Sequence, residues 1–205
     1  MECRVESPDE DQRLTLPSWI PGSYLLREFA RHVVRIRAES NGRELVVEKL
    51  DKGTWSCRGA GKELAVTIEV YALDRSVRGA YLDGTRSFFN GTCLFLCPKG
   101  LEEEPVELLV EAPDDARCTE WRVATSMRRG DVDSNGFGRY EADGYDELID
   151  HPFEISDHDV IAFEAGGVSH EFIVAGRHEA DLERVTTDLR LLCETQNRFF
   201  GETAP

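Results

Sequence analysis

Histidine beside glutamate is the pairing in this chain that could serve a hydrolytic zinc ion. A zinc site of the H-E-x-x-H type needs two histidines four residues apart on one helical face, because only then do both imidazoles reach one metal. The chain has two His-Glu pairs, His170-Glu171 and His178-Glu179, and the positions four residues after the two histidines are Val174 and Leu182. Apolar neighbours predict an extended β segment around His170. We therefore expect no metal site, no bound cofactor and no catalytic residue in this chain.

Other catalytic signatures are missing from the sequence as well. A hydrolytic triad would need a nucleophile on a tight G-x-S-x-G turn, and no such turn occurs. Phosphate loops and dinucleotide fingerprints are also absent. The six cysteines form no C-x-x-C pair and are too few for a disulfide framework, so reduced thiols are expected. The remaining histidines are scattered singly, which is typical of surface or capping residues: His32, His151, His158 and His178.

Short segments that alternate apolar and polar residues, separated by turn residues, predict a mainly β protein, an antiparallel β-sandwich. The clearest strand covers residues 64–71, and its apolar alternation predicts a central position. Val34, Ile36 and Ala38 are expected on one face of an earlier strand, followed by a hairpin turn at Asn41-Gly42. Further strands are expected at residues 93–97, 106–111, 121–125, 137–142 and 160–163.

A single amphipathic helix is predicted near the C-terminus, at about residues 179–200. Leucine, valine and phenylalanine recur there at spacings of three, four and seven residues. Acidic residues suit its N-terminal end, and Gly201 suits the position just past its last turn. We therefore divide the chain into a β-sandwich domain at residues 1–155 and the beginning of a second domain at residues 156–205.

The formal net charge of −16 argues against a nucleic-acid or anionic-membrane partner, since such surfaces need clustered Lys and Arg. No apolar run reaches the roughly 20 residues that span a bilayer. The first residues lack the apolar stretch of a secretion signal, which makes a cytoplasmic location the default expectation.

One stretch is not explained by strand periodicity. Residues 16–32 read LPSWIPGSYLLREFARH, with a tryptophan between two prolines and a Gly-Ser-Tyr turn leading into cations and an acid. Further blocks follow in order: LDKGTW at 50–55, YALDRSVR at 71–78, FFNGT at 88–92, YDELIDHP at 145–152 and GVSHE at 167–171. Together they resemble the N-terminal region of the glycyl-aminopeptidase family of zinc metallopeptidases.

The resemblance implies an N-terminal β domain that precedes a thermolysin-like catalytic domain. Zinc is then expected only in a full-length parent, bound by an H-E-x-x-H motif downstream of this chain. The expected function is that of a non-catalytic fragment of a glycine-preferring aminopeptidase. It would form a wall of the substrate cleft, and its partners would be its own downstream catalytic domain and, in the full-length protein, a peptide substrate.

Residues facing the cleft or the next domain follow from the same resemblance. The candidates for such a surface are Ser23, Tyr24, Arg27, Glu28, Asp83 and Asn90. A purely structural reading stays open, in which Trp19 anchors the loop on the core and Arg27, Glu28 and Arg31 form an ion-pair network. Support of the neighbouring domain is favoured over direct substrate contact.

A second class of function also stays open. The chain would then be a stand-alone β-sandwich module that binds peptides or a protein partner on a sheet edge. The C-terminal helix favours the aminopeptidase reading, because a sandwich does not need it. If the apolar face of that helix lacks its natural partner domain, it is expected to drive dimerisation.

Overall fold

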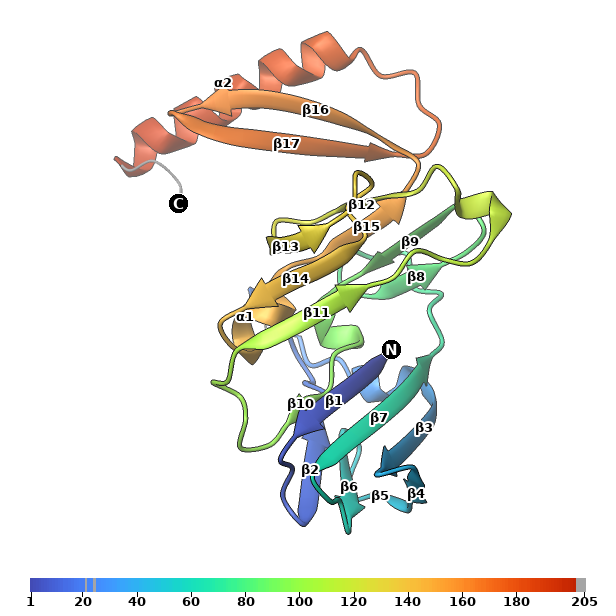
Figure 1. Ribbon diagram of the computed structural model, residues 1–205. Coiled ribbons are helices and arrows are strands. Elements are labelled where there is room, and N and C mark those ends of the chain that lie inside the picture. The colour runs from blue at the N-terminus through green and yellow to red at the C-terminus, as the bar shows by residue number, and fades with distance from the viewer. Residues whose placement is uncertain (21, 24, 202–205) are drawn as a thin grey trace.

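The computed structural model describes residues 1–20, 22–23 and 25–201, which form five antiparallel sheets (Figure 1). The strands are β1 (Glu2–Glu6), β2 (Asp11–Thr15), β3 (Val33–Ser40), β4 (Arg43–Leu45), β5 (Val47–Lys49), β6 (Thr54–Arg58), β7 (Glu63–Val70), β8 (Ala80–Leu82), β9 (Arg86–Phe89), β10 (Cys97–Pro98), β11 (Val106–Val110), β12 (Arg122–Ala124), β13 (Arg128–Val132), β14 (Gly138–Ala142), β15 (Phe153–Ser156), β16 (His158–Ala165) and β17 (Val168–Ala175). The helices are α1 (Tyr145–Asp150) and α2 (Leu182–Phe200), with 3-10 turns η1 (Phe29–His32), η2 (Gly91–Cys93) and η3 (Ala116–Cys118). The predicted mainly β fold is confirmed.

The N-terminal half is a sandwich of two four-stranded sheets, ordered β1-β7-β3-β4 and β10-β2-β6-β5. Strand β7 lies between β1 and β3, and its buried face carries Leu64, Val66 and Ile68. These side chains pack in one core with Leu14 and Trp55 of the facing sheet. The predicted central strand is therefore confirmed, because alternation along β7 directs one apolar face inward.

Strand β3 departs from its predicted pattern at one residue. The register between β3 and β7 shifts between Val33 and Arg35, and Val34 is 61% exposed. The expectation that Val34 shares a face with Ala38 was wrong, because a bulge inserts one residue and turns its side chain outward. The hairpin turn at Asn41-Gly42 is confirmed, with φ of 51° and 73°, the left-handed values that a tight two-residue turn needs.

A second pair of sheets, β11-β14-β13 and β12-β15-β9-β8, lies above the first sandwich in Figure 1. Its core is aromatic. The Phe153 ring stacks on Phe89 with centroids 5.0 Å apart, and Tyr140 meets Phe153 edge-on at 5.6 Å. The short helix α1, which the sequence pattern did not predict, adds Tyr145, whose hydroxyl donates to the buried carbonyl of Phe95 at 2.7 Å.

The strand predicted at residues 93–97 was wrong. Residues 91–93 form η2, and only Cys97 begins a strand, the two-residue β10. Cys93 and Cys97 do not share a face, since Cys93 packs in a small cluster with Ile20 and Phe29, whereas Cys97 lies in the second core. Alternation failed here because a 3-10 turn interrupts the extended backbone.

The hairpin of β16 and β17 and the helix α2 follow β15 (Figure 1). Ile161, Phe163 and Ala165 form the buried face of β16, against which α2 packs. The predicted helix is confirmed: Asp181 caps its N-terminus by accepting from the Arg184 N–H at 3.1 Å. Gly201 ends it with φ of 74°. The boundary at 155/156, at the last residue of β15, stays a prediction.

Two findings bear on cysteine chemistry and on membranes. All six cysteines are free, as expected. Burial raises the pKa of Cys93 to about 11 and that of Cys97 to about 12, so both thiols are protonated at neutral pH. Across the described residues, helix length and hydropathy together never meet the requirements for a transmembrane span.

Truncation of Phe153 tests the aromatic core. Phe153 is fully buried, so we expect Phe153→Ala to lower the free energy of unfolding by about 3–5 kcal/mol through lost contacts and a cavity. Urea denaturation would measure the change. Phe199→Ala is the matched control, since Phe199 is 81% exposed and its loss should cost little. Equal effects of the two substitutions would contradict the assignment of the core.

The N-cap of α2 gives a second test. Asp181→Ala removes the acceptor for the Arg184 N–H and should cost about 1 kcal/mol of local helix stability. Hydrogen exchange of the α2 amides would report the loss. Asp188→Ala removes the same charge from an exposed ion pair with Arg184 and should have a smaller effect. Unchanged exchange in Asp181→Ala would show that packing alone holds the helix.

Candidate functional site

The loop of residues 17–28 is held by the buried Ile20 within it and by the buried Phe29 just after it. Ile20 and Phe29 pack with Ala80 and Cys93. The Ser23 N–H donates to the Ile20 carbonyl at 3.1 Å, which closes a turn. The interpretation in which Trp19 anchors this loop on the core is wrong, because Trp19 is 54% exposed.

A groove of about 430 Å³ lies beside this loop. One side comes from the loop and η1, and the other from the segment after β7 and the start of β8. It is lined by Leu25, Leu26, Arg27, Glu28, Phe29, Arg31, His32, Val70, Tyr71, Asp74, Gly79, Ala80 and Cys93. A Cβ at position 79 would lie only 2.4 Å from Cγ of Asp74, so glycine is needed for this close approach. Three of the predicted surface residues, Ser23, Arg27 and Glu28, therefore come together at or beside one groove.

The charged side chains of the groove have distinct partners. Glu28 pairs with Lys52, which follows β5 and is far away in sequence. Hydrogen bonding from Lys52 lowers the pKa of Glu28. The Arg27 Nη1 donates to Ser23 Oγ at 2.7 Å and to the Leu25 carbonyl at 3.1 Å. The ion-pair network expected among the loop's own cations and acid is thus replaced by one long-range pair.

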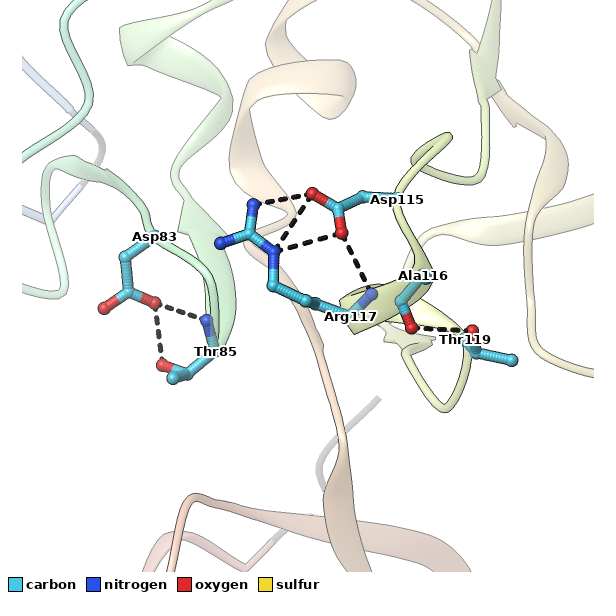
Figure 2. A network of polar contacts seen from close by, with 6 residues as sticks. All are labelled: Asp83, Thr85, Asp115, Ala116, Arg117 and Thr119. Carbon is cyan, nitrogen blue, oxygen red and sulfur yellow. Dashed lines mark hydrogen bonds and ion pairs between the residues drawn. The ribbon is translucent and has the colours of Figure 1, made fainter.

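Asp83 lies outside that groove, in a smaller hollow of about 250 Å³ with Arg75, Tyr81, Thr85, Arg86 and Phe88. Its Oδ1 accepts from the Thr85 N–H and hydroxyl, both at 2.7 Å (Figure 2). Tyr81 donates its hydroxyl to Oδ2 at 2.6 Å. These hydrogen bonds, that of Tyr81 first, hold the pKa of Asp83 well below its ordinary value of 3.8.

Two further features fix the turn that contains Asp83. Arg75 donates to the Tyr81 hydroxyl at 2.9 Å, with its guanidinium 5.0 Å from the ring centroid. A Cβ at Gly84 would lie 3.1 Å from Nη1 of Arg117, so the Asp115–Arg117 pair lies directly beside this turn (Figure 2). The sequence pattern did not single out Tyr81, since its role depends on a contact with Arg75 across the turn of residues 74–80.

Asn90 caps η2. Its Oδ1 accepts from the Thr92 N–H at 3.2 Å and from the Thr92 hydroxyl at 2.6 Å. The Asn90 N–H donates to the Gly79 carbonyl at 3.1 Å, which places Asn90 next to the groove. Tyr24, the remaining candidate, lies outside the described residues.

The described part of the chain holds no group of three or more His, Cys, Asp or Glu side chains that could bind a metal ion. His170 lies in β17 and stacks on Phe163 with ring centroids 5.0 Å apart. Val174 lies on the same strand, where residues four apart are separated by roughly 13 Å of extended backbone. The Cys93 thiol donates to the Arg78 carbonyl at 3.3 Å, and its raised pKa does not suit a nucleophile. The groove instead offers the charged side chains of Arg27, Glu28, Arg31 and Asp74.

Replacement of Tyr81 tests the hydrogen bonds at Asp83. A lowered carboxylate pKa stabilises the fold above the unfolded value, 3.8, and the stabilisation is lost as pH falls through the folded pKa. We expect Tyr81→Phe to raise the pKa of Asp83 toward 3.8 and to reduce that stabilisation. Carboxyl carbon NMR would follow the titration. Tyr71→Phe is the matched control on an exposed ring, and the same shift in both variants would contradict the assignment.

Comparison with known proteins places these features in a family. Residues 1–157 match the Peptidase M61 N-terminal domain. The chain is similar to an aminopeptidase N family protein from Idiomarina loihiensis, at 42% identity and a TM-score of 0.92, over 98% of this chain and 34% of that protein. It thus spans about a third of that relative's length. An M1 zinc metallopeptidase from Deinococcus radiodurans matches at 11% identity and a TM-score of 0.44, over 98% of this chain and 48% of that protein. Because the family match takes in 157 of 205 residues, the chain belongs to the family of Peptidase M61 N-terminal domains.

Proposed function

We propose that this chain is the non-catalytic N-terminal part of a zinc aminopeptidase with a preference for N-terminal glycine. It packs on a downstream catalytic domain and forms one wall of the substrate cleft. The observation that carries the proposal is the 42% identity to an aminopeptidase N family protein of which this chain spans 34%. The zinc ligands would then belong to the downstream domain.

Exposed apolar side chains around the groove support the packing role. We define a docking face as the exposed side chains that line the groove (Leu25, Leu26 and Tyr71) and those that neighbour them in sequence (Trp19, Leu73 and Val77), each between 54% and 73% exposed. Apolar side chains gathered on one face lose free energy when another surface covers them. The loop of residues 17–28, with its unusual composition, supplies half of this face, so a partner surface explains its exposed residues better than the core does.

The helix α2 supports the same proposal. Leu182, Val185 and Leu189 are half-buried on the side of the hairpin. A second set, Leu191, Leu192, Phe199 and Phe200, is 58% to 81% exposed. An amphipathic helix normally buries one apolar stripe, so the second set favours a further contact beyond the hairpin.

The candidate surface residues differ in what they can offer a substrate. An aminopeptidase must hold the free ammonium of its substrate with acceptor groups. Asn90 Oδ1 already accepts two hydrogen bonds, both from Thr92. The groups that Asn90 can offer a substrate are therefore the donors of its side-chain amide. Glu28 is an exposed carboxylate at the groove with one cationic partner. Glu28 is therefore better suited than Asn90 to the ammonium.

Sequencing the source gene past the codon for Pro205 tests the proposal. We expect an H-E-x-x-H motif followed by a further glutamate ligand. A stop codon directly after Pro205 would contradict the proposal and leave a stand-alone binding module. The longer protein should hydrolyse glycyl-p-nitroanilide and lose this activity with a zinc chelator, whereas the 205-residue chain should be inactive.

The docking face is tested in the same longer protein. Leu25→Asp together with Leu26→Asp should lower kcat/KM by about tenfold or more, because buried apolar contacts dominate such interfaces. Val46→Asp together with Leu109→Asp provides the control, since it adds the same charge at two apolar side chains that are 84% and 58% exposed and do not line the groove (β4, β5 and β11 in Figure 1). An equal loss in both variants would contradict the docking face.

Self-association tests the exposed stripe of α2. With this stripe uncovered, we expect the 205-residue chain to dimerise as its concentration rises, and Leu192→Glu with Phe199→Glu to keep it monomeric. Light scattering would give the mass of each. Thr187→Glu with Arg190→Glu is the control on exposed polar positions of the same helix. A monodisperse monomer of the unmodified chain would count against the stripe as an association surface.

A further inference from the structure

Two arginines line the groove without a carboxylate partner among the described residues. Arg27 is half-buried, and both of its hydrogen bonds use Nη1. Its Nη2 and Nε donors have no partner in the part of the chain that the structure describes. Arg31 donates through Nε to Nε2 of His32 at 3.0 Å. Its two terminal nitrogens have no hydrogen-bond partner among the described residues. In a chain with net charge −16, this is a local excess of cationic donors.

The two carboxylates of the groove do not cancel this excess. Glu28 is paired with Lys52, a further cation. Asp74 accepts from the Ser76 N–H at 2.8 Å, and this bond, more than the charges of His32 and Arg31, lowers its pKa. With Lys52 included, the groove carries three full positive charges against two negative ones. A planar guanidinium also offers paired N–H groups that match the two oxygens of a carboxylate.

The rest of the groove suits a small peptide. Phe29 supplies apolar surface on the side of the loop and η1, and Val70 supplies it on the facing side, where Gly79 and Ala80 also line the groove. A volume of about 430 Å³ is within the range of small-ligand pockets, roughly 300–1,000 Å³. Through the Gly79–Asn90 hydrogen bond, the groove adjoins the surface proposed to face the cleft.

We infer that this groove binds the C-terminal carboxylate of short peptides, with Arg27 and Arg31 as its ligands. The inference rests on the proposed function, which supplies a peptide substrate, and it adds a preference: peptides short enough to reach from the cleft to these arginines are bound better than long ones. An acidic segment of the neighbouring domain would be a different occupant of the same groove.

Titration of the 205-residue chain with triglycine tests the inference. At low ionic strength, where exposed charges are least screened, we expect saturable NMR shifts of the Gly79 and Ala80 amides. Triglycine amide, which lacks the carboxylate, should bind at least about fivefold more weakly, a loss of about 1 kcal/mol. Acetate should shift the same amides, but more weakly, because it lacks the peptide.

Substitutions locate the site. Arg27→Gln and Arg31→Gln should each weaken triglycine binding by about fivefold. Arg37→Gln is the matched control, because Arg37 is an exposed arginine of β3 that does not line the groove. The amide spectrum of each variant, recorded without peptide, shows whether it is folded.

Three outcomes would overturn the inference: no saturable shifts, equal binding of triglycine and its amide, or equal weakening by Arg37→Gln. Acetate binding as tight as triglycine would also overturn it, since the groove would then hold any small anion. The proposed function fails separately, through a stop codon after Pro205 or an inactive longer protein. The triglycine titration of the 205-residue chain is a separate measurement, so its outcome can be distinguished from a stop codon after Pro205 and from an inactive longer protein.

Discussion

Two hydrophobic cores meet along the segment of residues 95–97, and the arrangement of the molecule depends on this junction. Phe95 packs in the second, aromatic core, whereas Leu96 packs in the first sandwich. Extended backbone sends successive side chains in opposite directions, so two adjacent residues can belong to two cores. Strand β10 then pairs with β2 while Cys97 remains in the second core. Side-chain burial in this segment, together with Met1, which packs against both cores, therefore connects the two pairs of sheets.

The groove and the docking face are consequences of this junction. Just before it, η2 brings Cys93 under the loop of residues 17–28, where Ile20 and Phe29 complete a small third cluster. Those few buried contacts fix the loop at Ile20 and Phe29, and they leave Leu25 and Leu26 exposed between these two residues and Trp19 exposed just before them. Core packing accounts for the buried residues Ile20 and Phe29 of the signature, but not for the exposed Trp19, Leu25 and Leu26. The proposed second domain would cover these side chains, and it would also cover the second apolar set on α2.

Sequence reasoning succeeded where one local period governs the structure. Strand β7 and helix α2 each follow a regular apolar repeat, and both were predicted within a few residues. It failed where a single residue breaks the period. The bulge at Val34 and the 3-10 turn at residues 91–93 each change the direction of side chains without leaving a signal in the apolar pattern. Of the candidate surface residues, Arg27 and Glu28 share a groove, whereas Asp83 lies in another hollow.

The sequence by itself determined the mainly β class, the C-terminal helix, the absence of an H-E-x-x-H motif and the family, because these depend on local periods, fixed spacings and ordered motifs. Only the tertiary structure decided which charges have partners. Glu28 finds Lys52, and the Tyr81 hydroxyl connects Arg75 with Asp83, through contacts that folding makes between separate elements or across a turn. Such pairings depend on distance in space, which residue order does not encode, and they leave Arg27 and Arg31 facing the groove.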